Sequence, residues 1–194
     1  MNDLLAHVPV SAQAKEAALR RLQEPHRRYH NLEHVLEMWR WHREYSRGQF
    51  SDAVVASFCL YHDVIYQPCA KDNELRSADL WLTVSDDRLV HQAILASADH
   101  FKVHREPCVD WCLNLDLLRL GTPNHEFTQH GLDIRAEYAQ LSDHQWVKAS
   151  SEFRAKVMAQ STIFRFAEFA GFERQARYNL ATALIEDWRA LDYV

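Results

Sequence analysis

The segment FCLYHDVIYQ, residues 58–67, places an adjacent histidine and aspartate directly after an apolar run. Two further segments belong with it, YHNLEH at residues 29–34 and NLDLLRLG at residues 114–121. Neutral imidazoles and carboxylates are the ligands that Mn, Fe, Ni and Zn ions prefer in proteins. Four such ligands would come from these segments, namely His34, His62, Asp63 and Asp116. The pattern therefore predicts a metal site and, with it, an enzyme.

The surroundings of these residues favour the ligand interpretation over the ordinary one. The chain has 12 histidines, and a single histidine is more often a surface or hydrogen-bonded residue than a ligand. However, His62 and Asp63 follow an apolar run, and Asp116 lies among leucines. Burying a carboxylate there is unfavourable unless a cation or hydrogen bonds compensate.

The composition predicts an all-α fold. Only 4 glycines and 5 prolines interrupt 194 residues, and the intervening sequence is rich in residues that favour helix. With 47% hydrophobic residues, the length suits one core, so we expect a single domain over residues 1–194. Helices are expected over residues 11–22, 32–45, 51–67, 73–85, 87–99, 107–119, 124–141, 143–161 and 172–190.

Helix geometry determines which of these side chains can meet. Asn31 and Ser51 are expected N-caps, and Pro68 is expected to end the helix that carries the His-Asp pair. On a helix, His30 and His34 would lie one turn apart and share a face. His62 and Asp63 would point about 100° apart, which lets both reach one ion.

Charge, cysteine spacing and the N-terminal sequence limit the class of protein. A formal net charge of −5 argues against stable nucleic-acid binding. The four cysteines show no C-x-x-C spacing, which favours free thiols in a reducing compartment. The N-terminus lacks the charged start and apolar stretch of a signal peptide, and no segment is apolar enough to cross a bilayer. We therefore expect a soluble cytoplasmic protein without membrane contact.

The chain resembles the HD-domain superfamily of metal-dependent phosphohydrolases, whose signature is a first His, an adjacent His-Asp and a distant Asp. It is most similar to the subgroup described as predicted metal-dependent HD phosphohydrolases of unassigned substrate. The matching segments are RRYHNLEHV (27–35), YHDVIY (61–66), DNELRSA (72–78), LDLLRLG (115–121) and FERQARYNL (172–180).

The resemblance implies a helical bundle with the metal site between central helices. His34, His62, Asp63 and Asp116 would surround one divalent ion, which could be Mn, Fe, Ni, Co, Zn or Mg. His100 would contact the substrate, belong to a second ion or support the first. The implied activity is hydrolysis of a small phosphoester, for example a nucleotide, by a water that the cation activates.

Other residues near these motifs have candidate roles, each with an alternative. Arg27 and His30 would stabilise phosphoryl charge, although Arg27 could equally pair with Glu24 on the surface. Glu74 is a candidate base, or a first-turn acid that stabilises its own helix end. Two further candidates for substrate contact are Lys71, which could simply be solvated, and Tyr66, which could simply close the core.

Three other functions fit parts of the sequence. His30, Glu33 and His34 match the H-x-x-E-H pattern of a class of zinc proteases, in which Glu33 would be essential. An HD-type domain could instead act as a metal-dependent oxygenase or as a non-catalytic nucleotide sensor. Trp39 and Trp41 are not easily both buried in a monomer, so the sequence leaves the oligomeric state open, with a homodimer as one alternative.

Overall fold

The computed structural model describes residues 1–192, and this range contains helices and 3-10 turns but no strand. The predicted all-α fold is confirmed. The chain forms two compact units, one over residues 1–116 and one that begins at Leu117. Each unit is described below by itself, and the single-domain assignment stays a prediction.

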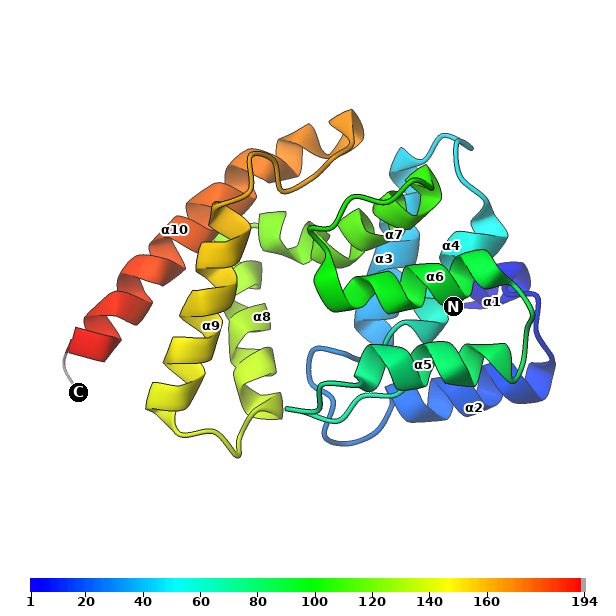
Figure 1. Cartoon of the computed structure of the whole chain (residues 1–194), viewed down its shortest axis with the longest axis horizontal. Coiled ribbons are helices and arrows are strands. Elements are labelled where there is room, and N and C mark those ends of the chain that lie inside the picture. The colour runs from blue at the N-terminus through cyan, green and yellow to red at the C-terminus, as the bar shows by residue number, and fades with distance from the viewer. Residues whose placement is uncertain (193–194) are drawn as a thin grey trace. The chain divides into compact units, whose positions relative to one another are not determined.

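The first unit is built around one buried helix. Its elements are α1 (Asn2–His7), α2 (Ala12–Leu22), α3 (Leu32–Tyr45), α4 (Asp52–Tyr61), α5 (Asn73–Leu82), α6 (Arg88–Ala96), the 3-10 helix η1 (Ser97–Asp99) and α7 (Pro107–Leu117), drawn in Figure 1. Every residue of α4 from Val54 to Tyr61 is buried, because this helix packs against α1, α2, α3, α5 and α6. The His-Asp pair therefore follows the most enclosed helix of the unit.

The expected helix starts are confirmed more fully than the ends. The Asn31 side chain accepts hydrogen bonds from the backbone N–H groups of Glu33 and His34, and α3 has the expected bounds. Ser51 caps α4 in the same way. However, α4 ends at Tyr61, so the expectation that it continues to Pro68 is wrong. Residues 63–67 form hydrogen bonds with side chains instead of continuing the helix.

The two tryptophans of α3 are both buried in the single chain. Trp39 and Trp41 expose only 4% and 7% of their surface, although the sequence had indicated that both are not easily buried in a monomer. Trp39 is covered by α1, a helix that the sequence did not predict. Asp3 of this helix accepts a hydrogen bond from Trp39 Nε1 at 2.8 Å, and the ring of His7 lies 5.2 Å from the Trp39 ring.

The second unit contains η2 (Leu118–Gly121), α8 (Asn124–Glu137), α9 (Asp143–Met158), η3 (Ala167–Phe169) and α10 (Ala170–Asp192). The long helix α10 packs against α9 and η2, and Figure 1 shows α9 and α10 side by side. Buried Asn179 of α10 donates hydrogen bonds to the carbonyls of Leu120 and Thr122, both at 2.9 Å. This buried amide ties α10 to the chain that follows α7.

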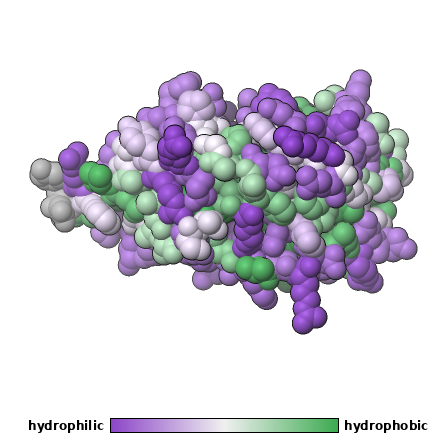
Figure 2. Space-filling view, turned by 90° about the horizontal axis from the view of Figure 1, so that it is seen from above, coloured by the Kyte–Doolittle hydropathy of each residue, from purple (hydrophilic) through white to green (hydrophobic). Residues whose placement is uncertain are grey.

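The surface is predominantly hydrophilic on the face that Figure 2 shows, with hydrophobic residues in patches between the polar ones. Within residues 1–192, no helix has the length and apolar character needed to cross a membrane.

Candidate metal centre

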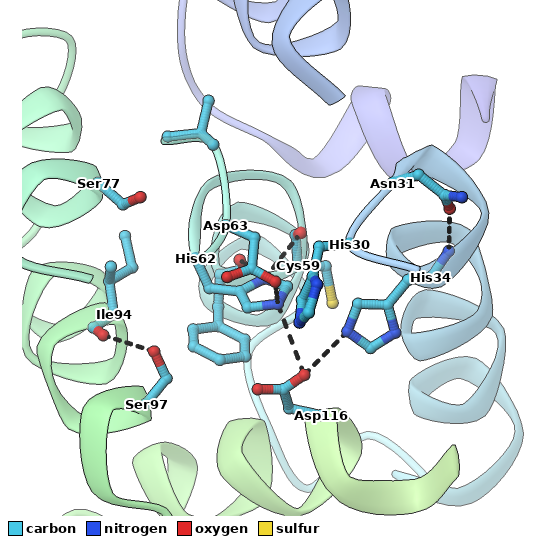
Figure 3. A network of polar contacts seen from close by, with 12 residues as sticks. His30, Asn31, His34, Cys59, His62, Asp63, Ser77, Ile94, Ser97 and Asp116 are labelled. Carbon is cyan, nitrogen blue, oxygen red and sulfur yellow. Dashed lines mark hydrogen bonds and ion pairs between the residues drawn. The ribbon is translucent and has the colours of Figure 1, made fainter. Parts of the chain in front are cut away.

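The predicted ligands lie together in the first unit, although they come from separate elements. His34 is in the first turn of α3, His62 is the C-cap residue of α4, Asp63 follows it, and Asp116 lies near the end of α7. Figure 3 shows these four side chains directed toward one another. The Asn31 cap fixes the start of α3, and with it the direction of His34.

The distances within the cluster are short enough for one ion. Ligand atoms of His34, His62 and Asp63 all lie within 4.8 Å of one another. Asp116 Oδ1 lies 2.8 Å from His34 Nε2 and 3.6 Å from His62 Nε2. These two distances make Asp116 the candidate fourth ligand, although it lies outside the group whose ligand atoms are all within 4.8 Å of one another.

The two nitrogens of His62 have different surroundings. His62 Nδ1 lies 3.2 Å from the carbonyl oxygens of Phe58 and Cys59, so this nitrogen carries the proton and donates to the backbone. The opposite nitrogen, Nε2, is enclosed and makes no hydrogen bond within the described part of the chain. It nevertheless lies 3.1 Å from Asp63 Oδ2. A backbone bond on one nitrogen that orients the other toward a shared point is the usual arrangement of a metal-binding histidine.

Both oxygens of Asp116 are engaged by histidines. His34 Nε2 donates to Oδ1 at 2.8 Å, and His100 Nε2 donates to Oδ2 at 2.7 Å. His100, which follows η1, thus supports the carboxylate from the side away from His34. This contact agrees with the expectation that His100 belongs to the ligand sphere or supports it.

The electrostatics of the cluster favour charged carboxylates. Burial lowers the pKa of His62, but the nearby charges of Asp63 and Asp116 reverse that effect and hold this pKa well above its usual value. Burial raises the pKa of the Asp63 and Asp116 carboxyls, but the nearby charge of His62 outweighs this effect at both, helped at Asp116 by the hydrogen bonds of His34 and His100, and holds both pKa values below their usual range. Within the chain, the charge that compensates these two buried carboxylates is the protonated His62, and a divalent cation bound between the same groups would take over that role.

The thiol of Cys59, also visible in Figure 3, is an unsuitable ligand. Burial raises its pKa, and the charge of Asp116 raises it further. The group therefore stays a neutral thiol, and a metal ligand must be the thiolate.

His30 lies beside the cluster but outside any helix. It precedes α3, so it does not share a helix face with His34 as the sequence had suggested. Its ring stacks on Tyr66, with centroids 4.3 Å apart, and meets Tyr29 edge-on at 4.8 Å. Figure 3 shows the His30 ring beside His62, Asp63 and His34, and the charge of His30 contributes to lowering the pKa of Asp63. Tyr66 itself is buried, and its ring lies against His26, Arg27 and His30 rather than in solvent.

Arg27 is buried rather than open to a substrate. Its side chain is fully enclosed, and Nε donates to Glu24 at 3.1 Å. The two terminal nitrogens donate to backbone carbonyls. This placement agrees with the alternative in which Arg27 pairs with Glu24, except that the arginine lies inside the protein and not on its surface.

Glu74 and Lys71 lie further along the chain. Glu74 is in the first turn of α5, where an acid stabilises the positive end of the helix, and it is half-buried. Lys71 is exposed before that helix, in agreement with the solvated alternative. Neither belongs to the metal-binding group defined by the described residues.

The position of Glu33 argues against a protease-like site. It lies exposed in the first turn of α3, whereas His34 is buried. In the H-x-x-E-H arrangement both histidines lie on one helix with the glutamate as base, and His30 is outside α3.

Two residues that organise the site were not identified from the sequence. Ser77 bonds the backbone of Ile65, and Asn73 bonds the backbone of Gln67. Both belong to the segment DNELRSA, four residues apart on one face of α5. That spacing of two polar residues on the inner face is the signal that could have indicated them.

A scan against protein-family models finds no matching family, and searches of curated proteins and of solved structures find no match.

Proposed function

We propose that His34, His62, Asp63 and Asp116 hold one divalent cation and that the protein is a metal-dependent hydrolase of a small phosphoester. The observation that carries the proposal is the orientation of His62. Its Nδ1 donates to backbone carbonyls, and its enclosed Nε2 faces Asp63, Asp116 and the His34 ring. Two imidazoles and two carboxylates form a donor set that suits Mn, Fe, Co, Ni or Zn.

A bound divalent cation would polarise a phosphoryl oxygen and lower the pKa of a water toward neutrality. The residues of the chain would hold and orient the reacting groups. His100 keeps the Asp116 carboxylate in place through its 2.7 Å hydrogen bond. His30, packed against Tyr66 beside Asp63, can donate a hydrogen bond to a phosphoryl oxygen as negative charge develops there.

The order of the ligands along the chain supports phosphoester hydrolysis over other metal chemistry. A first His, an adjacent His-Asp and a distant Asp are the pattern in which the chain resembles HD-domain phosphohydrolases. The exposed position of Glu33 favours this assignment over a zinc protease. A nucleotide is one candidate for the substrate.

Metal content and activity should be measured together. The protein is stripped with a chelator, reloaded separately with Mn, Fe, Co, Ni, Zn and Mg, and assayed on nucleoside monophosphates and on p-nitrophenyl phosphate. We expect one ion per chain and phosphate release, both lost in Asp63→Asn and in Asp116→Asn. Glu33→Gln is the control and keeps both. Folded Asp63→Asn that retains metal and activity, or loss of both in Glu33→Gln, would refute the proposal.

A further inference from the structure

Residues 63–67, which follow His62, form neither helix nor strand, yet side chains bond each of their five carbonyl oxygens. The partners are Arg27 for Asp63 (2.7 Å) and Val64 (3.2 Å), Ser77 for Ile65 (3.3 Å), His26 for Tyr66 (3.2 Å) and Asn73 for Gln67 (3.0 Å). We name these residues the bonded segment. A stretch without regular structure is held rigid when its polar backbone groups find partners inside the protein. The segment is therefore a fixed support for the Asp63 side chain.

Arg27 differs from the other partners because it joins two parts of the site. A single nitrogen, Nη1, donates to the carbonyl of Asp63 at 2.7 Å and to the carbonyl of His30 at 2.9 Å. These two carbonyls belong to residues far apart in the sequence, and both side chains lie at the candidate metal centre. One guanidinium nitrogen thus fixes the separation between the two backbones.

The other nitrogens of the Arg27 guanidinium group also have partners inside the protein. Nε donates to Glu24 Oε2 at 3.1 Å, Nη2 donates to Val64, and the group lies 5.3 Å from the centre of the Tyr66 ring. Tyr66 in turn stacks on the imidazole of His30. A planar fork with several donors can make all these contacts at once, whereas a lysine ammonium carries its donors on one atom.

We propose that Arg27 is a positioning residue of the candidate metal centre, which sets Asp63 and His30 relative to each other and does not itself contact the substrate. The inference rests on the proposed metal site. It replaces the expected role of Arg27 as a direct phosphate ligand, because a fully enclosed guanidinium whose nitrogens bond carbonyls and Glu24 presents no face to a substrate.

The test uses Co²⁺ as the probe, because its visible spectrum reports the number and arrangement of its ligands. Arg27→Lys keeps the charge but loses the fork, so we expect a changed spectrum and a drop in Co²⁺ affinity of about 10- to 100-fold, as found when residues that orient metal ligands are replaced. Circular dichroism checks that the variant is folded.

Arg135→Lys is a matched control in the second unit. Arg135 also donates to two backbone carbonyls, Tyr138 and Leu141, and to a carboxylate, Asp143. It also lies over an aromatic ring, at 5.9 Å from the centre of Trp146. We expect the wild-type Co²⁺ spectrum and affinity in this variant. An equal drop in both variants would overturn the proposal, because the effect would then be a general cost of losing a bonded arginine.

Chemical rescue separates positioning from simple destabilisation. In Arg27→Ala, guanidinium chloride at a non-denaturing concentration should restore part of the Co²⁺ affinity, and the same concentration of sodium chloride should not. If no Arg27 variant folds, Glu24→Ala leaves the arginine in place and removes the acceptor that orients it, and its Co²⁺ affinity should fall in the same direction.

The outcomes distinguish this inference from the proposed function. If the wild-type protein binds no Co²⁺, Mn²⁺ or Zn²⁺, the metal site fails together with everything built on it. If the wild type binds Co²⁺ and folded Arg27→Lys gives the same spectrum and affinity, only the role of Arg27 is overturned. In the absence of a folded Arg27 variant, wild-type behaviour of Glu24→Ala overturns it equally.

Discussion

His42 and His62 are both buried in the first unit, but their surroundings shift the pKa in opposite directions. Burial lowers the pKa of His42, and the hydrogen bond to Asp52 only partly offsets it. Trp111 Nε1 donates to His42 Nδ1 at 3.1 Å, so that nitrogen must stay unprotonated. At His62 one nitrogen already donates to the backbone and the other faces carboxylates. The partners of each ring therefore decide its charge.

The depressed pKa of His42 predicts a loss of stability in acid. Because the pKa of this group is lower in the folded chain than in the unfolded chain, the unfolded chain binds more protons below about pH 6.5. The contribution of His42 is therefore complete above that pH and is lost as the pH falls through the folded-state pKa. We expect the difference in unfolding free energy between wild type and His42→Gln to shrink on acidification, by at most about 1.4 kcal/mol per pH unit.

Urea denaturation at a series of pH values measures this difference. The raised pKa of His62 has the opposite effect on stability. The stabilisation that comes from protonated His62 is complete at low pH and is lost as the pH rises through the folded-state pKa. That contribution is common to both proteins and cancels in the subtraction. A difference that does not change with pH would contradict the lowered pKa of buried His42.

At the scale of elements, the Asn31 cap connects helix stability with the candidate metal centre. Its side chain accepts from the N–H groups of Glu33 and His34, at 2.9 Å and 3.2 Å, so Asn31→Ala leaves both donors without this partner. We expect a loss of about 1 kcal/mol in unfolding free energy and weaker metal binding, because His34 lies in the turn that the cap fixes. Denaturation and Mn²⁺ titration measure the two effects.

Ser142→Ala is the comparison for the cap. Ser142 and Gln145 form a capping box at the start of α9, in the second unit. Its loss should lower stability by a similar amount of about 1 kcal/mol and leave Mn²⁺ affinity unchanged. Equal weakening of Mn²⁺ binding in both variants would contradict the claim that the Asn31 cap supports metal binding by fixing the position of His34.

Two glycines of the second unit should respond in opposite directions to alanine. A Cβ at Gly121 of η2 would lie 2.7 Å from the Cβ and from the backbone oxygen of Phe172 in α10. Gly121→Ala should therefore destabilise by about 1–3 kcal/mol, as overpacking does. At Gly131, inside α8, a Cβ meets nothing within 4 Å, so Gly131→Ala should stabilise by about 0.5–1 kcal/mol. Thermal denaturation followed by circular dichroism measures both, and stabilisation by Gly121→Ala would show that the two elements can move apart.

Helix starts were predictable because capping is local, whereas the end of α4 was not. Asn31 and Ser51 bond N–H groups two or three residues away, and such spacings can be read in a sequence. The helix ends at Tyr61 because the following carbonyls bond Arg27, Ser77 and Asn73, partners distant in the sequence. The same distance explains why the burial of Arg27 was not predicted.

At the scale of the whole molecule, the sequence predicted an all-α chain and the proximity of the four candidate ligands. It did not indicate the division at residues 116 and 117. Linkers are normally recognised by proline, glycine or polar residues, but here α7 runs to Leu117 and η2 begins at Leu118, within a run of leucines. A boundary inside continuous helical sequence leaves no compositional signal. The metal assignment and the phosphoester substrate stay predictions.

The candidate ligands span residues 34–116, so they converge only when the first unit is folded. A cation that binds the folded chain and not the unfolded chain stabilises it by mass action, by about 2.7 kcal/mol at a concentration 100 times the dissociation constant. We therefore expect Mn²⁺ to raise the melting temperature of the protein and a chelator to reverse the rise. Differential scanning calorimetry at several Mn²⁺ concentrations measures the shift.

Two variants test whether Mn²⁺ raises the melting temperature by binding at the candidate metal centre. Asp116→Asn retains an oxygen toward His34 but halves the negative charge of the two-carboxylate pair, so its melting temperature should respond little to Mn²⁺. Glu33→Gln changes an exposed acid of α3 and should respond as the wild type does. An undiminished rise in Asp116→Asn would mean that Mn²⁺ stabilises the chain from elsewhere. A site that needs residues of α3, α7 and the end of α4 predicts that metal binding and folding of the first unit fail together.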